Sequence, residues 1–192
     1  MTDFDFSYEA TEPSNNYTLV IDSDIKTVWA LINDFGGWGT WTKMFRLCKI
    51  IDEDGIDQVG CTRQFSPPTL DNYYLEQLTY RNEEKTTIKY NVTKYVPPIP
   101  ELTMIHINVV LIPLGDNKVQ LSEIVWNRFT EDAPPGFAEG VRMIQNTGAC
   151  RTYHDLADYI KQQEKKASIE TRTPSLSQQE IDRSRSEVNN RY

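Results

Sequence analysis

The amino-acid sequence predicts an α+β protein in which a seven-stranded, curved antiparallel sheet is filled by one long C-terminal helix. Two observations lead to this prediction. Six strand-like runs follow one another without an intervening helix, and short charged turns join several of them. A helical pattern then extends from about residue 135 to 164, and one long helix can cover the open face of such a sheet.

The N-terminal part supplies the first strand and one or two short helices. Residues 17–21 (YTLVI) favour a strand. Polar residues 22–24 can cap the helix that follows. Its apolar side chains recur at i, i+3, i+4 and i+7, namely at Ile25, Val28, Trp29 and Ile32. The glycine-rich segment 35–41 (FGGWGTW) ends this helix and favours a turn or a second short helix.

The six further strands are expected at 43–51, 58–65, 73–81, 86–95, 102–112 and 118–129. Their tight turns at 52–57, 81–85 and 114–118 carry charged residues together with Gly or Asn. A meander of this kind is antiparallel, unlike the parallel sheets that bind nucleotides. We expect the inward stripe of the long helix to contain Val141, Ile144, Gly148, Thr152, Leu156 and Ile160.

The chain of 192 residues, 39% of them hydrophobic, has the size of one domain. We expect a flexible N-terminus over residues 1–15 and a folded ligand-binding domain over 16–164. The tail over 165–192 is rich in Ser, Gln, Asn and Arg, so we expect it to be disordered or extended. A short partner-binding helix around Leu176–Ile181 is the alternative for this tail.

Composition excludes several classes of function. With 20 Lys+Arg against 28 Asp+Glu, the chain lacks the cationic excess that nucleic acids or anionic membranes attract. The longest apolar run, VVLIPL at 109–114, is too short for stable membrane insertion. Three cysteines without a CxxC motif and only two histidines predict neither a metal site nor a disulfide framework. No secretory signal is recognised, so we expect a cytoplasmic protein. We also expect no cofactor.

Seven of the ten prolines fall into three longer connections at 66–72, 96–101 and 131–136. Alternate connections of a meander lie at the same end, so these three loops are expected to gather there. Stiff, partly apolar loops at one end of a curved sheet suit the lids of a cavity mouth. The alternative is that they merely plug the end of the sheet.

Strand alternation predicts which side chains point inward. It places five polar side chains on the inner face, which are Arg63, Glu76, Tyr90, Glu123 and Asn127. It also turns Val59, Tyr80 and Thr103 inward and His106 outward. Burying a single charge costs several kcal/mol, so Arg63 and Glu76 either pair or face a solvated cavity. Since Glu123 has no evident cationic partner, a solvated cavity is predicted beside it.

Three segments resemble one superfamily: VWALINDFGGWGTW from residue 28, VGCTRQF at 59–65 and LEQLTYRNEEKTTIKYNV at 75–92. They are similar to the START/pollen-allergen (SRPBCC) superfamily, in its polyketide cyclase/dehydrase-like branch, and distantly to the plant abscisic-acid receptors. The resemblance spans about residues 17–163. It implies a helix-grip fold, with two short helices after the first strand, and a cavity for a small hydrophobic or amphipathic molecule.

By position, the resemblance implies ligand contacts from Glu76, from the wall residues Tyr90 and Val92, and from Asn127. On the long helix it implies contacts from Ile144, Gly148 and Thr152. Together with the inner-face analysis, the candidate ligand-binding residues are Arg63, Phe65, Leu70, Tyr74, Glu76, Tyr90, Val92, Ile105, Glu123, Asn127, Ile144, Gly148 and Thr152.

The sequence also departs from the receptors. SPPTL at 66–70 replaces their gate motif, and PPIPE at 97–101 replaces their latch. Thr42 stands where the hormone-anchoring lysine is expected, with Lys43 one position away. Abscisic-acid sensing is therefore not predicted.

Three functions remain open. The leading hypothesis is a non-catalytic carrier or sensor of a small hydrophobic or amphipathic molecule. The second is an enzyme of the cyclase, dehydratase or lyase type that needs no metal, with Glu76, Glu123 and Tyr90 as the candidate acid/base residues. The third is a module whose mouth loops, Ser66–Asn72 and Val96–Glu101, bind a protein partner when the ligand enters.

Overall fold

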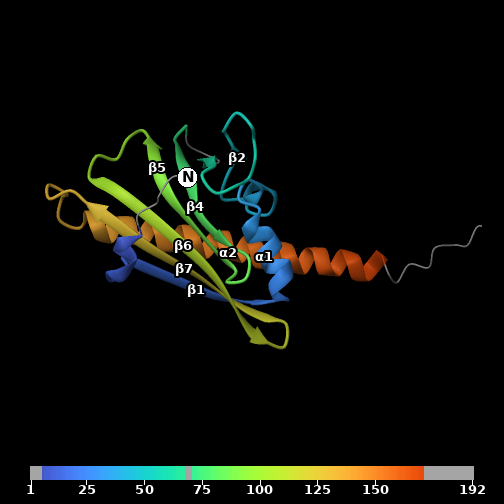
Figure 1. Ribbon diagram of the computed structural model, residues 1–192. Coiled ribbons are helices and arrows are strands. Elements are labelled where there is room, and N and C mark those ends of the chain that lie inside the picture. The colour runs from blue at the N-terminus through green and yellow to red at the C-terminus, as the bar shows by residue number, and fades with distance from the viewer. Residues whose placement is uncertain (1–5, 68–70, 171–192) are drawn as a thin grey trace, which may run out of the picture. The chain divides into compact units, whose positions relative to one another are not determined.

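The computed structural model describes residues 6–67 and 71–170. Its seven strands form one antiparallel sheet in the order β1-β7-β6-β5-β4-β3-β2 (Figure 1). The strands are β1 (Asn15–Asp22), β2 (Leu47–Ile50), β3 (Thr62–Ser66), β4 (Tyr73–Asn82), β5 (Thr87–Val96), β6 (Leu102–Gly115) and β7 (Lys118–Phe129). Strands β2 to β7 therefore form the predicted meander, and β1 pairs with the free edge of β7. The predicted fold class is confirmed.

Helix α1 (Ile25–Asn33) follows β1 as the spacing predicts. The Asp24 carboxylate caps it by accepting hydrogen bonds from the backbone N–H groups of Lys26 (2.9 Å) and Thr27 (3.0 Å). The helix buries Val28, Trp29 and Ile32, which are three of its four predicted apolar positions. The short 3₁₀ helices η1 (Ser7–Ala10) and η2 (Trp38–Thr40) lie on either side of it in the sequence.

The two glycines before η2 leave space for neighbouring side chains. A Cβ atom at Gly37 would lie 1.8 Å from a carboxylate oxygen of Asp34. At Gly36 a Cβ atom would approach the Ile50 side chain to 3.0 Å. Gly36 therefore lets the segment after α1 pack against Ile50 on β2, and Gly37 leaves room for the Asp34 carboxylate.

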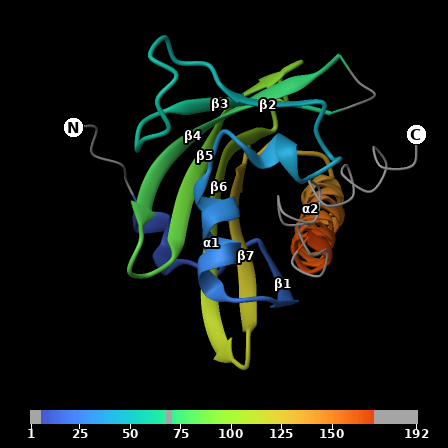
Figure 2. The ribbon, with the colours of Figure 1, turned by 90° about the vertical axis from the view of Figure 1, so that its right-hand side faces the viewer.

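Helix α2 (Phe137–Glu170) is slightly longer than predicted. Its portion up to Ile160 belongs to the same compact unit as the sheet, and its residues from Lys161 on belong to a second unit. Figure 2 shows the part of α2 that belongs to this first unit beside the curved sheet. Of the predicted tail, residues 165–170 continue α2, and 171–192, with the alternative helix at 176–181, lie outside the described residues.

The inward face of α2 differs from the predicted stripe. Thr152, Leu156 and Ile160 are buried as predicted, but Ile144 is 70% exposed, so the prediction that Ile144 faces the sheet is wrong. Ile144 precedes the buried Tyr153 by nine residues, or about two and a half turns, which places the two on opposite sides of the helix. Several apolar stripes fit this sequence, and only packing selects one.

Three predicted inward orientations are wrong, two of them at irregular strand pairing. A register shift between Leu78 and Tyr80 inserts Thr79, so Tyr80 points to the outer face. The prediction that Tyr80 points inward is therefore wrong. Val59 precedes β3 and is 48% exposed, and Thr103 is exposed at a register shift in β6.

The N-terminal segment covers part of the outer face of the sheet. The Glu9 carboxylate contacts both His106 Nε2 (3.0 Å) and Lys89 Nζ (2.6 Å). The Trp126 indole N–H donates to the carbonyl oxygen of Thr11 (3.1 Å). His106 points outward as predicted, but this segment buries it completely. Residues 1–5, the first part of the N-terminus that was expected to be flexible, lie outside the described residues.

Candidate functional site

One cross-strand row on the inner face brings together five of the predicted site residues. Arg63 pairs in register with Glu76, Glu76 with Val92, Val92 with Ile105, and Ile105 with Asn127. Directly paired residues on neighbouring strands share one face of a sheet. The row therefore crosses strands β3 to β7 and faces α2.

Arg63 and Glu76 form an internal ion pair. Arg63 Nε donates to Glu76 Oε2 over 2.7 Å, and Nη1 donates to the Phe35 carbonyl oxygen over 2.7 Å. The guanidinium carbon lies 3.7 Å from the Phe35 ring centroid, 4.1 Å from that of Trp38 and 4.3 Å from that of Phe65. Arg63 is 0% exposed. Of the two alternatives, the internal pair is the one observed, and it anchors the segment after α1 to the sheet.

Asn127, at the other end of the row, pairs with α2. Its side-chain amide donates to Gln145 Oε1 (2.9 Å), and the Gln145 amide donates back to Asn127 Oδ1 (3.0 Å). On the outer side, the backbone N–H of Asn127 donates to Ser14 Oγ (2.9 Å). Gln145 was not predicted, because the helix stripe was assigned through its neighbour Ile144.

Glu123 lies in a second row, in register with Tyr17 on β1 and Val109 on β6. The Tyr153 hydroxyl donates to Glu123 Oε2 over 2.6 Å. Tyr153 is fully buried and stacks on Tyr17 at 6.1 Å between ring centroids, with Trp38 at its edge. Sequence reasoning missed Tyr153, although its spacing of three and seven residues before Leu156 and Ile160 fits one helix face.

The electrostatic surroundings of Glu123 suit proton exchange. Burial raises the pKa of Glu123 from 4.5 to about 7, and the hydrogen bond from Tyr153 opposes this rise only in part. Burial likewise raises the pKa of the Tyr90 and Tyr153 hydroxyls well above the ordinary value, so both stay protonated. A carboxyl group with a pKa near 7 can accept or donate a proton at neutral pH.

Three inner-face oxygens have no hydrogen-bond partner within residues 6–67 and 71–170: Glu123 Oε1 and the hydroxyls of Tyr74 and Tyr90. Some polar atoms, such as Trp41 Nε1, are fully buried and lack a hydrogen-bond partner. The three oxygens do not belong to this fully buried group. Each of the three oxygens therefore reaches space that a water molecule can enter. The inner face therefore presents three accessible oxygens beside aromatic rings, since Trp38 contacts Tyr90 and Phe65 stacks on Tyr74.

Tyr74 and Phe65 form one of these walls, with their rings stacked at 5.5 Å and 11°. Trp38 meets Tyr90 edge to face at 6.1 Å. A pocket of about 260 Å³ opens near this region, where the pairing of β5 with β6 ends. Its lining joins the inner row to the proline-rich loop and comprises Val92, Thr93, Lys94, Tyr95, Pro98, Ile99, Leu102, Thr103, Met104 and Ile105.

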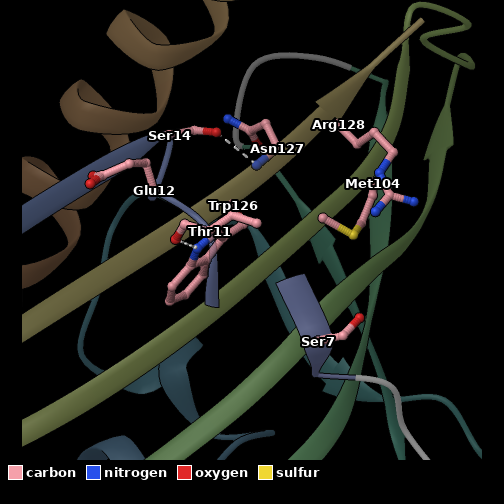
Figure 3. A pocket seen from close by; sticks show the side chains of 8 residues that line it. All are labelled: Ser7, Thr11, Glu12, Ser14, Met104, Trp126, Asn127 and Arg128. Atoms are coloured by element: carbon pink, nitrogen blue, oxygen red, sulfur yellow. Dashed lines mark hydrogen bonds between the residues drawn. The ribbon is translucent and has the colours of Figure 1, made fainter. Parts of the chain in front are cut away.

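A second pocket, of about 320 Å³, lies on the outer face between the N-terminal segment and strands β6 and β7 (Figure 3). It is lined by Ser7, Thr11, Glu12, Ser14, Met104, Trp126, Asn127 and Arg128. Asn127 is the single predicted site residue in this lining, and the Arg63–Glu76 pair and Glu123 are not part of it. The outer pocket is therefore distinct from the inner row.

The remaining predicted residues lie in different places. Phe65 is buried in the core, Thr152 is buried on α2, and Gly148 is half-buried. Ile144 points to solvent, and Leu70 lies outside the described residues. Along the described ranges, no group of three or more His, Cys, Asp or Glu is placed to hold a metal ion. Nor does any helix found there have the length and apolar character to cross a membrane.

A curved antiparallel sheet, closed by a long helix over an aromatic and polar inner face, defines a helix-grip protein. The model of the family "Polyketide cyclase / dehydrase and lipid transport" matches residues 14–152. Because this match covers most of the chain, the protein belongs to that family, as the resemblance implied. A search of curated proteins finds no match.

Solved structures share the fold at low sequence identity. A protein from Nitrosospira multiformis is 18% identical with a TM-score of 0.61, covering 74% of this chain and 92% of that one. The protein XoxI from Bacillus cereus is 16% identical with a TM-score of 0.62 and coverages of 75% and 92%. A START superfamily protein from Mycobacterium smegmatis is 14% identical with a TM-score of 0.53 and coverages of 79% and 97%.

Proposed function

We propose that this protein binds a small hydrophobic or amphipathic molecule between the inner face of its sheet and α2, as a carrier or sensor. Membership of a family that includes lipid-transport proteins supports a ligand of this kind. The observation that carries the proposal is the set of three oxygens, on Glu123, Tyr74 and Tyr90, which have no partner among the described residues and reach accessible space beside aromatic rings.

The route of entry in this proposal lies at the end of the β5–β6 pair. Val92 and Ile105 belong to the inner row, and Pro98 and Ile99 belong to the loop, yet all four line one pocket. An apolar ligand passing this loop would meet Val92 and Ile105 of the inner row, and Lys94 is the one charged residue among those that line the pocket. The proline-rich loop then acts as the lid that its composition predicts.

The proposal is tested with one variant that narrows the pocket and a control variant at an exposed position. Val92→Phe places a larger side chain in the pocket, and Ile112→Phe makes a similar change at a position that is 44% exposed. Thermal unfolding is measured with a library of small lipophiles. The stabilisation that a ligand confers on the wild type should disappear in Val92→Phe and persist in Ile112→Phe.

A direct measurement complements the variants. Mass spectrometry of the denatured protein, purified from its natural source, should release a bound lipophile. Finding no such molecule, together with no thermal shift across the library, would overturn the proposal.

Glu123 supports a second candidate function, an enzyme of the cyclase, dehydratase or lyase type. Its pKa of about 7 and its hydrogen bond from Tyr153 suit a general acid or base. Glu123→Gln should then keep ligand binding but lose turnover by at least about 100-fold. Unchanged turnover in this variant would remove Glu123 from the chemistry.

The distant likeness to abscisic-acid receptors does not extend this proposal to their hormone. Thr42, at the place of the expected lysine, is buried and donates its hydroxyl to Asp155 on α2 (3.0 Å). The backbone N–H of Lys43 donates to the same Asp155 oxygen (2.7 Å). Within this proposal, these residues tie the segment after η2 to α2 and leave no cation at the hormone-anchoring position.

A further inference from the structure

The charges of the inner face restrict which head group a ligand can present. Arg63 is enclosed by aromatic rings, and its charge is matched by Glu76 at 2.7 Å. Among the described residues, no Lys or Arg forms an ion pair with the carboxyl group of Glu123. An anionic head group would therefore meet a carboxyl group without a compensating cation.

The hydrogen-bonding groups point to the same restriction. Asn127 and Gln145 satisfy each other through two hydrogen bonds, so their amides are engaged. One oxygen of Glu123 accepts from Tyr153, which leaves its Oε1 as an acceptor open to a ligand. The hydroxyls of Tyr74 and Tyr90 can donate or accept. A hydroxyl head group can donate to Glu123 Oε1 and accept from a tyrosine hydroxyl, whereas an ammonium head group can donate both to Glu123 Oε1 and to a tyrosine oxygen.

We infer that the ligand of this protein carries a hydrogen-bond-donating head group, a hydroxyl or an amine, and not a carboxylate. This inference rests on the proposed function, because it concerns the same inner space. The apolar part of the molecule would lie along Val92 and Ile105, toward the pocket at the end of the β5–β6 pair. Simple fatty acids are thereby disfavoured as ligands, and lipophilic alcohols or amines are favoured.

Three probes with the same alkyl chain separate the head groups: 1-octanol, octylamine and octanoate. Their dissociation constants for the full chain are measured by calorimetry at pH 8. We expect 1-octanol or octylamine to bind at least ten-fold more tightly than octanoate. Comparing 1-octanol with octylamine distinguishes a neutral hydrogen-bond donor from a cationic one. Octanoate binding as tightly as both others would overturn the inference while leaving the proposed function intact.

Variants assign the preference to Glu123. Glu123→Gln removes the charge, so the disadvantage of octanoate should shrink to about three-fold or less. The matched control is Glu139→Gln, which removes an exposed carboxylate from α2 and should leave the ratio unchanged. An unchanged ratio in Glu123→Gln would contradict the inference. If no probe binds the wild type, both the proposed function and this inference fail.

Discussion

The hydroxyl of Tyr153 on α2 donates to the carboxyl group of Glu123 on β7 over 2.6 Å. Both groups lie at the inner face, and Tyr153 is held in place by stacking on Tyr17. The contact therefore joins helix to sheet at a titratable group. It also leaves one Glu123 oxygen directed into accessible space, which makes this pair the polar centre of the candidate site.

Glu123 should make the stability of the protein depend on pH. Its pKa in the folded state is about 7, above the ordinary 4.5, so its protonated form favours folding. The associated stability is complete below pH 4.5 and is lost as the pH rises through 7, by roughly 3 kcal/mol at most. Urea denaturation at pH 5 and pH 8 should show this loss in the wild type and not in Glu123→Gln. An equal loss in both proteins would contradict the assignment.

His106 should produce the opposite trend. Burial lowers its pKa from 6.5 to about 4, although Glu9 favours the charged form. The unfolded chain thus binds the proton more readily, so stability present above pH 6.5 falls as the pH drops toward 4. His106→Gln should lose less stability than the wild type between pH 7 and pH 4.5. The exposed His154 gives the control, since His154→Gln should behave like the wild type.

The Arg63–Glu76 pair predicts strong coupling between two substitutions. Removing either partner leaves the other charge buried, which costs about 3–5 kcal/mol of unfolding free energy. Arg63→Met combined with Glu76→Leu should cost clearly less than the sum of the single changes. Chemical denaturation of all four proteins gives the coupling energy. Additive effects would show that the two side chains do not act as a buried pair.

The orientation of α2 can be tested at two apolar positions. Leu156→Ala should cost about 2–5 kcal/mol, because Leu156 is 0% exposed in the core. Ile144→Ala should change the unfolding free energy by less than about 0.5 kcal/mol, because Ile144 is 70% exposed. The midpoint of urea unfolding distinguishes the two. A large loss in Ile144→Ala would restore the predicted inward stripe.

The fold and much of the inner face could be predicted because alternation and turn chemistry are local properties. Direct pairing places Arg63, Glu76, Val92, Ile105 and Asn127 in one row on the face that alternation assigned to them. The exceptions are local too. Tyr80 reverses its face at a register shift, and a single inserted residue of this kind leaves little trace in the hydrophobic pattern.

The partners of the polar groups could not be predicted in the same way. Glu123 and Tyr153 are 30 residues apart, and Asn127 and Gln145 are 18 apart, so each contact depends on how α2 is rotated over the sheet. The helix carries more than one apolar stripe, and its sequence alone does not select among them. The choice of stripe brought Gln145 and Tyr153 inward and turned Ile144 outward.

By itself, the sequence determined the order of the meander strands, most of their faces and the five polar side chains that alternation places on the inner surface, since these follow from periodicity along the chain. Only the tertiary structure decided that Arg63 is neutralised by Glu76 and that Glu123 keeps an open oxygen. The reason is that the free energy of a buried charge depends on distances between side chains from separate elements, which packing alone sets.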